Sequence, residues 1–365
     1  MDYTNSNLVL EKQHIKSGSI TWRSPSNLAL IKYWGKYGRQ LPRNPSISFT
    51  LNNAFTETTL AYQPKASSVD SIALNFYFEK KENEAFKNKV LKFLESIDDI
   101  FPFLKELELT IHSYNSFPHS TGIASSASAM SALATCLCSL ENELFGTLNN
   151  EKDFFQKASY VARLGSGSAS RSVYPTMAIW GASKVAEGSS NLYAIPWGQN
   201  VAKVFHTFHD TILIADRKEK SVSSRAGHAL MEGNIFAENR YAQANERFEK
   251  LLLALKDGDL DTFGMITENE ALTLHALMMT SEPSYILMRP NTLVMIEKIR
   301  AYRKATQQPL YFSLDAGPNI HLLYPDEIKE DVLVFIKNEM ESLCENGEWI
   351  ADQVGEGSVK LNSIG

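Results

Sequence analysis

The chain has 365 residues, of which 44% are hydrophobic and 21% are charged. This composition is typical of a globular protein and excludes a disordered tail, a fibrous repeat and a small disulfide scaffold. The net charge of −6 excludes a global electrostatic attraction to nucleic acid or to an anionic membrane. At about 150 residues per domain, the length predicts two domains.

The cysteines and the N-terminal residues indicate a cytoplasmic protein. Cys136, Cys138 and Cys344 are odd in number, which argues against a disulfide framework, and no second Cys or His pair stands at metal-binding spacing. We therefore expect Cys136 and Cys138 to be small core residues. Residues 1–16 contain no apolar segment typical of a signal peptide, and no stretch of the chain is apolar enough to span a bilayer. Neither nucleic acid nor a membrane is expected as a partner.

The first half of the chain mixes predicted strands and helices after a polar lead-in at residues 1–18. Alternating or continuous apolar patterns predict strands, and apolar residues three and four apart predict helices. In chain order these are strands at 19–22, 47–51, 56–62 and 72–78, a helix at 82–96, a strand at 107–111, helices at 127–137 and 152–164, and strands at 174–182 and 192–195.

The second half has the same mixed character. In chain order the patterns predict a strand at 211–215, helices at 236–256, 260–278 and 291–306, strands at 310–314 and 320–324, and a closing helix at 328–343. This order predicts two α+β domains around a cleft, with the boundary at residues 196–203. We assign residues 1–200 to the first domain and residues 201–365 to the second.

A loop rich in small residues lies between a predicted strand and a predicted helix at residues 117–127, Phe-Pro-His-Ser-Thr-Gly-Ile-Ala-Ser-Ser-Ala. Gly122 permits a tight turn with close approach of the backbone to a ligand. Ser125 and Ser126 fall at the start of the helix, where free N–H groups favour an anion. The context favours phosphate binding over the alternative, a serine N-cap on a buried helix. The loop is not a Walker motif, because Gly-Lys-Ser/Thr is absent.

A second loop follows the helix predicted at 152–164 and reads Gly-Ser-Gly-Ser-Ala-Ser-Arg-Ser at residues 165–172. It offers hydroxyl groups, backbone amides and the guanidinium of Arg171, which binds carboxylate and phosphate through a rigid fork of donors. The alternative is a flexible linker, but linkers seldom lie between amphipathic segments. We expect this loop to bind a ligand.

Two further motifs carry charged residues. Asp315 stands at the end of an apolar strand, before a Gly-Pro turn, where it either faces a cleft or caps its own backbone as an Asx turn. At residues 27–36, Lys32 and Lys36 flank Tyr, Trp and Gly, a pattern that suits an anionic ligand. Alone, such a run is more often a strand with solvated lysines.

Taken together, these motifs resemble the diphosphomevalonate decarboxylases, a family of the GHMP kinase superfamily. The matching segments lie in the family's order at residues 27–36, 115–127, 162–172, 221–227 and 312–319. The resemblance implies a two-domain α+β GHMP kinase fold, with a first domain similar to ribosomal protein S5 domain 2 and a ferredoxin-like second domain. It also implies a homodimer.

The resemblance implies an ATP-dependent carboxy-lyase. ATP phosphorylates the C3 hydroxyl of mevalonate 5-diphosphate, and loss of the 3-phosphate and of carbon dioxide then gives isopentenyl diphosphate. In this reading Asp315 takes the hydroxyl proton, and Lys32 offsets charge near the transferring phosphoryl group. Arg171 and Asn27 hold the C1 carboxylate, and Arg171 keeps Asp315 ionised.

The same resemblance implies two sets of phosphate contacts. The 5-diphosphate is held by Tyr33, Lys36, Ser166, Ser168 and Arg225, together with Arg171 at the carboxylate end of the substrate. ATP is bound by Pro118, Gly122, Ala124, Ser125, Ser126 and Ser224. Mg²⁺ is expected as a cofactor bridging phosphate oxygens, with Ser125 and Ser126 as its protein contacts.

Comparison within the superfamily favours a decarboxylase over a kinase. Typical GHMP kinases, such as mevalonate kinase, carry their catalytic Asp in the second loop, where this chain has Arg171. Relatives that only phosphorylate the 3-hydroxyl depart from the family at the Lys and Asp positions, whereas this chain keeps Lys32 and Asp315.

Several alternatives stay open. The chain departs from the family pattern at His119-Ser120, at Ser170 and at Pro175-Thr176, while keeping the catalytic set. Decarboxylases of the 5-monophosphate or of mevalonate 3,5-bisphosphate are very similar, and a 3-kinase without decarboxylation is a further alternative. A binding protein that has lost the chemistry is disfavoured by Lys32 and Asp315. A serine hydrolase lacks the Gly-x-Ser-x-Gly elbow.

Overall fold

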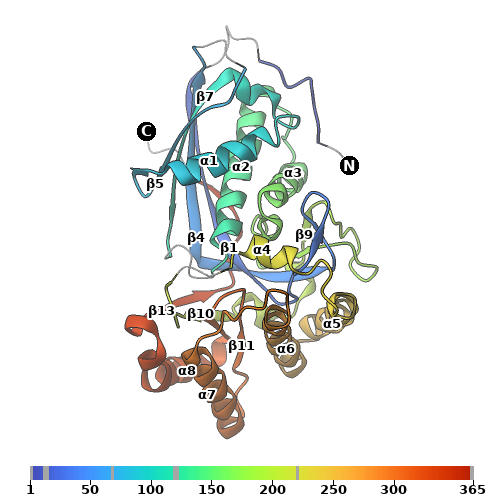
Figure 1. The fold of residues 1–365 in the computed structure, drawn as a ribbon, viewed down its shortest axis with the longest axis vertical. Helices are drawn as coiled ribbons and strands as arrows, with labels where there is room; N and C mark the ends of the chain where they lie inside the picture. Colours follow the sequence, from blue (N-terminus) through green and yellow to red (C-terminus); the bar gives the residue numbers. More distant parts are fainter. Residues whose placement is uncertain (1–2, 11–15, 67–69, 118–122, 219–221, 362–365) are drawn as a thin grey trace.

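The computed structural model describes residues 3–10, 16–66, 70–117, 123–218 and 222–361. Two parts are stacked along the long axis of the molecule (Figure 1). The upper part consists mainly of the first half of the chain, and the lower part consists of the second half. Within the described residues, no helix has the length and apolar character needed to cross a membrane.

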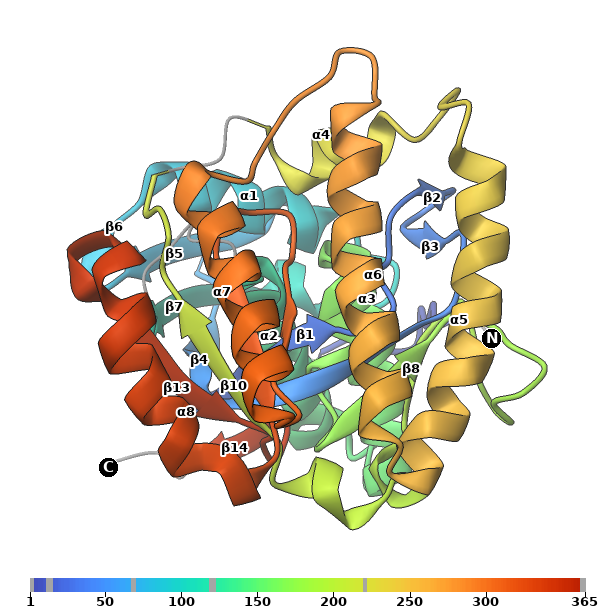
Figure 2. The same cartoon turned by 90° about the horizontal axis from the view of Figure 1, so that it is seen from below.

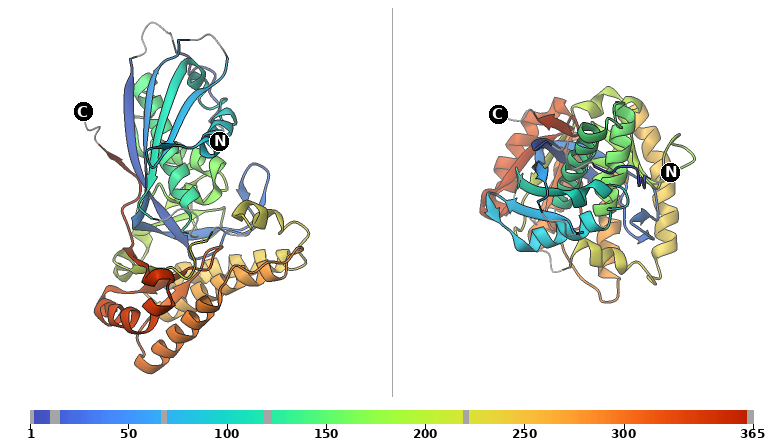
Figure 3. Two further views of the ribbon diagram at one scale, coloured as in Figure 1. Left: turned by 60° about the vertical axis from the view of Figure 1, so that its left-hand side comes forward. Right: turned by 90° about the horizontal axis from the view of Figure 1, so that it is seen from above.

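The upper part is built on a mixed sheet in which the described strands follow the order β14-β1-β4-β7-β5-β6, with β8 and β9 attached beside β4. Its members are β1 (Gly18–Ala29), β4 (Ser46–Pro64), β5 (Ala73–Phe78), β6 (Lys81–Glu82), β7 (Leu107–Asn115), β8 (Met177–Trp180), β9 (Ala194–Pro196) and β14 (Val359–Leu361). Only the β5–β7 pairing is parallel among these strands. Because β14 pairs with β1, the chain returns to its first sheet at the end (Figure 3).

Three helices cover one face of this sheet: α1 (Glu84–Glu95), α2 (Ser125–Phe145) and α3 (Glu151–Gly165). The side chain of Asn83 caps α1, and that of Asn150 caps α3. Helix α2 is rich in Ala and Ser and lies close against β1 and β4. Cys136 and Cys138 are fully buried thiols in this core, as predicted. Leu8 of the predicted polar lead-in is also buried there.

The lower part has an antiparallel sheet in the order β11-β12-β10-β13. Its strands are β10 (His209–Leu213), β11 (Tyr311–Ser313), β12 (Ile320–Tyr324) and β13 (Trp349–Gln353). The helices α5 (Ala237–Asp257), α6 (Leu260–Met279), α7 (Pro290–Thr306) and α8 (Lys329–Phe335) lie side by side below it (Figure 2). The short helix α4 (Ser224–Ala229) and the hairpin of β2 (Lys36–Tyr37) and β3 (Leu41–Pro42) lie beside the junction of the two parts.

The long strand β4 links the two parts. The Asp352 carboxylate on β13 accepts hydrogen bonds from the backbone N–H groups of Asn52 and Asn53, both at 2.8 Å, and of Ala54, at 2.7 Å. Burial of this carboxyl raises its pKa to about 6, although these hydrogen bonds oppose the shift. These hydrogen bonds connect β4 of the upper sheet to β13 of the lower sheet and so fix the junction of the two parts.

Three sequence expectations need correction. The strands predicted at 47–51 and 56–62 are one continuous strand, because the exposed Asn52 and Asn53 interrupt the apolar pattern and the pairing with β1 without ending the strand. The helix predicted at 328–343 is α-helical only to Phe335 and continues as π and 3-10 turns. Strands β13 and β14 were missed, because each is short and carries polar residues.

Candidate active site

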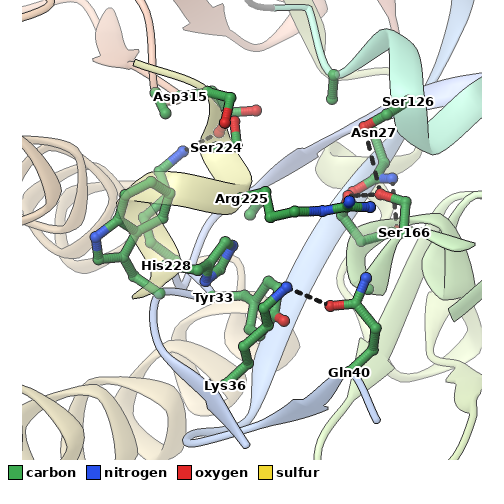
Figure 4. Close-up of a pocket in the computed structure, with 18 of the residues that line it drawn as sticks. Asn27, Tyr33, Lys36, Gln40, Ser126, Ser166, Ser224, Arg225, His228 and Asp315 are labelled. Atoms are coloured by element: carbon green, nitrogen blue, oxygen red, sulfur yellow. Dashed lines mark hydrogen bonds and ion pairs between the residues drawn. The ribbon is translucent and has the colours of Figure 1, made fainter. Parts of the chain in front are cut away.

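A cavity of about 620 Å³ opens at the junction of the two parts (Figure 4). Its lining comes from the loop after β1, the N-terminus of α2, the loop after α3, helix α4 and the loop after β11. Segments from the whole length of the chain thus meet in one place. We call the lining formed by Asn27, Lys32, Arg171 and Asp315 the buried wall, and that formed by Lys36, Ser125, Ser126, Ser224 and Arg225 the open wall.

An ion pair forms the centre of the buried wall. The Lys32 Nζ atom lies 2.9 Å from Oδ1 of Asp315. Lys32 is only 2% exposed, so the alternative of a solvated lysine on a strand is wrong. Asp315 follows β11, as the apolar strand pattern predicted, and its side chain is 22% exposed toward the cavity. The Asp315 carboxylate is thus held by a buried ammonium and can contact a ligand in the cavity.

Arg171 is the second cation of the buried wall, and it is 1% exposed. Its Nε donates to Ser48 Oγ at 2.9 Å, its Nη1 to Ser46 Oγ at 2.6 Å, and its Nη2 to Asn27 Oδ1 at 3.3 Å. Burial lowers the pKa of the guanidinium to about 10, while the nearby Asp315 acts in the opposite direction. Arg171 therefore carries its charge at neutral pH.

The partners of Arg171 are all neutral. Within the described parts of the chain, no carboxylate lies within ion-pair distance of its guanidinium. Asn27 is oriented in turn by donating its amide to the Ser168 carbonyl at 3.1 Å and to Ser172 Oγ at 2.7 Å. Because a buried charge is stabilised mainly by an opposite charge, this arrangement suits an anionic group of a ligand.

The start of α2 contributes the first anion site of the open wall. Ala124 precedes the helix in a left-handed conformation, with φ of 46°, and no side chain caps the helix. The first N–H groups of a helix lack partners within the helix, and together with the dipole they favour an anion. Ser126 is exposed beside these groups, and its Oγ lies 3.3 Å from Ser166 Oγ. This end of the cavity is suited to phosphate.

Helix α4 and Lys36 contribute the cationic side chains of the open wall. Ser224 and Arg225 are exposed on its first turn and face the cavity (Figure 4). Lys36 donates to Gln40 Oε1 at 2.7 Å. Burial and the Arg225 charge together lower the pKa of the Lys36 ammonium. A bound anion would relieve the repulsion between these two cations.

His228 on α4 is a lining residue that the sequence analysis did not identify. Its ring lies 4.3 Å from the Tyr33 ring and 4.5 Å from the Trp34 ring, measured between centroids. Its Nδ1 accepts a hydrogen bond from Gly35 N at 3.0 Å. Burial, with a smaller effect of Lys36, lowers the pKa of His228 to about 3. The ring is therefore neutral and carries its proton on Nε2.

Most of the predicted site residues line this one cavity. They are Asn27, Lys32, Tyr33, Lys36, Ala124, Ser125, Ser126, Ser166, Ser168, Arg171, Ser224, Arg225 and Asp315. Pro118 and Gly122, like His119, lie outside the described residues. The Tyr33 hydroxyl is buried and has no hydrogen-bond partner among the described residues.

Other lining or supporting residues were not predicted: Ser46, Ser48, Gln40, Lys89 and His228. The sequence could have indicated Ser46 and Ser48, because hydroxyl side chains two residues apart on a strand face the same side. Lys89 lies on the charged face of an amphipathic helix, and such residues are usually solvated. Nothing in the sequence around His228 distinguishes it from an ordinary helical residue.

The described residues contain no group of three or more His, Cys, Asp or Glu side chains arranged to hold a metal ion. The donors around the open wall are hydroxyls, backbone N–H groups and cations. Such a set fits a divalent cation only when phosphate oxygens supply most of its ligands.

Two family models match the chain. A diphosphomevalonate decarboxylase-like N-terminal domain matches residues 24–191, and a mevalonate 5-diphosphate decarboxylase C-terminal domain matches residues 211–362. A diphosphomevalonate decarboxylase of Aspergillus fumigatus is 29% identical over 333 residues, which is 87% of this chain and 79% of that protein. The enzyme of Saccharomyces cerevisiae is 29% identical over 340 residues, 88% of this chain and 81% of that protein.

Solved structures share the fold over nearly the whole length. The mevalonate diphosphate decarboxylase of Staphylococcus aureus superposes with a TM-score of 0.81 at 26% identity, covering 95% of this chain and 99% of that chain. The protein MDDEF, in complex with MVAPP, AMPPCP and magnesium, superposes with a TM-score of 0.78 at 27% identity, covering 95% and 100%. The α+β GHMP-type fold expected from the sequence is thereby confirmed.

Proposed function

Because the chain belongs to the diphosphomevalonate decarboxylase family, we propose that it converts mevalonate 5-diphosphate and ATP to isopentenyl diphosphate, ADP, phosphate and carbon dioxide. The chain is an ATP-dependent carboxy-lyase in this account. The matched regions extend through both parts of the fold and contain the residues of both walls of the cavity.

The observation that carries the proposal is the geometry of the buried wall. A buried Arg171 with only neutral partners lies near the Lys32–Asp315 ion pair. A substrate with a carboxylate and a neighbouring hydroxyl would give the guanidinium its missing anion and bring the hydroxyl to Asp315. Such a substrate is mevalonate, whose C1 carboxylate and C3 hydroxyl are separated by one carbon.

The reaction assigned to this wall has two stages. Asp315 accepts the proton of the C3 hydroxyl as its oxygen attacks the γ-phosphorus of ATP, and the bond to ADP breaks. The C3–O bond then breaks, so that phosphate leaves with the bonding electrons. The electrons of the C1–C2 bond form the C2=C3 double bond, and C1 leaves as carbon dioxide. Lys32 offsets negative charge at the transferring phosphoryl group throughout.

Arg171 has a role that changes between the stages. Arg171, oriented by Asn27, holds the carboxylate while the phosphoryl group is transferred, which orients C3 toward ATP. The product has no carboxylate, so this contact must be lost as carbon dioxide forms. The neutral partners of Arg171 keep the guanidinium in place, and they carry no negative charge that would compete with the carboxylate.

The open wall is assigned to the phosphates. In this proposal the 5-diphosphate is held by Lys36, Arg225, Ser166 and Ser168, with Tyr33, all of which line the cavity. The phosphates of ATP are held by the start of α2, with Ser125 and Ser126, and by Ser224 on α4. Mg²⁺, when bound with ATP, would neutralise phosphate charge there, and Ser125 and Ser126 are the residues that would reach it.

The ligands of a relative support this assignment. MDDEF binds MVAPP, AMPPCP and magnesium, that is, mevalonate diphosphate with an ATP analogue and the cation. The cavity of this chain is lined by hydroxyls, by cations, by the start of α2 and by the Lys32–Asp315 pair. We take ATP and Mg²⁺ as its co-substrate and cofactor on that basis.

The test compares carbon dioxide release from mevalonate 5-diphosphate, the 5-monophosphate and the 3,5-bisphosphate, each with and without ATP. We expect release from the diphosphate only when ATP is present. Release from the monophosphate alone would change the substrate assignment and keep the mechanism. Release from the bisphosphate without ATP would show that this protein carries out the decarboxylation stage without the phosphoryl-transfer stage. ADP formation without carbon dioxide from any substrate would make the protein a kinase and contradict the proposal.

Two further proposals concern assembly and location, and the first of them rests on the family resemblance. We propose that the protein is a homodimer, which light scattering at several protein concentrations would check. We also propose a cytoplasmic location, which agrees with three free, buried cysteines.

A further inference from the structure

The backbone of Lys32 is held by side chains from the other part of the molecule. The Lys32 N–H group donates to Glu270 Oε2 at 2.9 Å, and the Lys32 carbonyl accepts from Arg240 Nη2 at 3.2 Å. Glu270 lies on α6 and Arg240 on α5. Lys32 itself follows β1, more than 200 residues earlier, with sequence separations of 238 and 208 residues. The carbonyl also accepts from Asn44 Nδ2 at 3.2 Å, so the distant ion pair holds the N–H group and shares the carbonyl of this proposed catalytic residue.

This ion pair is buried and closely matched. Glu270 is 0% exposed and Arg240 is 3% exposed. Arg240 Nη1 lies 2.7 Å from Glu270 Oε1, and Arg240 Nη2 lies 2.5 Å from Oε2, which is a two-point contact. Arg247 adds a third bond to Glu270 Oε1 at 2.8 Å. Burial opposes ionisation of Glu270, but the guanidiniums and the Lys32 amide prevail and lower its pKa.

Helix α6 also holds the other member of the catalytic pair. Five residues after Glu270 on the same helix, His275 Nε2 donates to the Asp315 carbonyl at 3.0 Å. His275 is 1% exposed. Between them Leu274 contributes to the lining of the cavity. One rigid helix therefore contacts the backbone of Lys32 and the backbone of Asp315, whose side chains meet at 2.9 Å.

A buried ion pair is a poor means of stabilising a fold, because the cost of removing two charges from water offsets most of their attraction. Its strength is geometric, since a two-point guanidinium–carboxylate contact fixes direction as well as distance. Backbone groups alone could be satisfied by a neighbouring strand or by water. The use of two charged side chains to hold Lys32 indicates a need for accurate placement.

We propose that Glu270 and Arg240 are positioning residues, which act through Lys32 by fixing its backbone relative to Asp315. They touch neither substrate nor ATP in this account. This inference rests on the proposed function, because it assumes that Lys32 acts at the transferring phosphoryl group. Its consequence is that the rate of the chemical step depends on an ion pair in the second half of the chain.

The test replaces the ion pair as a whole, because removal of one partner leaves a buried charge without compensation. The variant Arg240→Met/Glu270→Leu nearly keeps the volume and removes both contacts of the ion pair to Lys32, while the Asn44 hydrogen bond to the Lys32 carbonyl remains. The partly exposed Arg247 remains free to reach water. We expect kcat for carbon dioxide release to fall by about 10-fold to 100-fold, as a misplaced catalytic group would cause, with the KM for ATP nearly unchanged.

A matched control uses a second buried ion pair. Lys157 and Glu141 on α3 and α2 are 2.5 Å apart, with side chains 4% and 3% exposed, and they contact none of the cavity residues named above. The variant Lys157→Met/Glu141→Leu carries the same kind of change in the upper core. We expect a change in thermal stability similar to that of the test variant, with kcat within about twofold of wild type.

A double-mutant cycle with Lys32→Met separates positioning from general damage. If Glu270 and Arg240 act through Lys32, adding Arg240→Met/Glu270→Leu to Lys32→Met lowers kcat no further. If the combined variant instead loses kcat by the product of the two separate factors, the proposal is wrong. A folded test variant with wild-type kcat would also overturn it. If the test variant does not fold, Lys32→Met is combined instead with Arg240→Lys, which keeps the opposite charges and removes the two-point contact, and the same two outcomes decide. A wild-type protein that releases no carbon dioxide would refute the proposed function itself, a result separate from all of these.

Discussion

The two walls of the cavity differ in how their charged groups are held. In the buried wall, Lys32 and Arg171 are 2% and 1% exposed, and each already has its protein partners. In the open wall, Ser126, Ser224 and Arg225 are exposed to solvent. The first set is fixed by long-range contacts to β4, α6 and the loop after α3, and the second stands on helix ends.

This contrast separates the groups that act in the reaction from the groups that bind the ligands. Groups aimed at a transition state are most effective when they are oriented before the substrate arrives, because no reorganisation is then needed. Groups that grip phosphate must exchange water for ligand, which favours exposure. The comparison predicts that changes in the buried wall lower kcat, or lower kcat/KM for the mevalonate substrate. Changes in the open wall should raise KM for the phosphorylated ligands.

The largest effect is expected at Asp315. The variant Asp315→Asn keeps the size of the side chain and removes its capacity to accept a proton, so kcat should fall by a factor of about 10² to 10⁴. Calorimetric titration should find ATP affinity within about threefold of wild type, since the open wall is intact. Asp257→Asn, at the exposed end of α5, is the control. Near wild-type turnover of Asp315→Asn would remove the proton-accepting role.

The next effect is expected at Arg171. A lysine cannot bond Ser46, Ser48 and Asn27 at once and also present a fork of donors to a carboxylate. Arg171→Lys should therefore lower kcat/KM for the mevalonate substrate by about 100-fold, the equivalent of losing one or two charged hydrogen bonds. The KM for ATP should change little. An equal rise in the KM of both substrates would show that Arg171 does not recognise the carboxylate.

A smaller effect is expected in the open wall at Arg225. Its charge is exposed, so Arg225→Gln should raise the KM for the mevalonate substrate by about 10-fold and leave kcat within about twofold of wild type. The remaining affinity should also depend less on salt than that of wild type, because one screened attraction has been removed. Lys256→Gln, also exposed on α5, is the matched control. A fall in kcat without a change in KM would place Arg225 in the reaction rather than in binding.

At neutral pH the smallest effect is expected at His228, and it concerns stability. Its pKa is lowered from 6.5 to about 3, so between these values the unfolded chain binds a proton that the folded chain does not. Stability is therefore lost as the pH falls below 6.5, with a slope of about 1.4 kcal/mol per pH unit from this group. In His228→Phe this contribution is absent. Urea unfolding from pH 7.5 to 4.5 gives the free energy of unfolding of both proteins. The difference between them should be constant above pH 6.5, and below this pH wild type should lose stability relative to the variant. Parallel curves would contradict the assignment.

The sequence predicted what depends on local pattern. The apolar run that ends at Asp315 is a strand, and Ser125 and Ser126 do begin a helix. Such features follow from periodicity and from the chemistry of helix ends, which act within a few residues. The family resemblance then related segments that local pattern cannot relate. The catalytic and binding roles, and the domain division at residues 200 and 201, stay predictions.

The sequence could not predict what depends on tertiary contact. Glu270 and Arg240 occupy helices in which charged residues usually face water, and nothing nearby marks them as buried. Their burial follows only from the meeting of α5 and α6 with the loop after β1, over 200 residues away in sequence. Lys32 was open to the interpretation of a solvated lysine for the same reason. His228 acquires its low pKa from rings and a cation that reach it only in the fold.

The central claim is that the buried wall phosphorylates and then decarboxylates one substrate. The most direct measurement follows carbon dioxide, ADP and phosphate together from mevalonate 5-diphosphate and limiting ATP. The account predicts equal amounts of all three products, with none formed when ATP is left out. ADP formed without carbon dioxide, or no turnover by the folded protein, would contradict it.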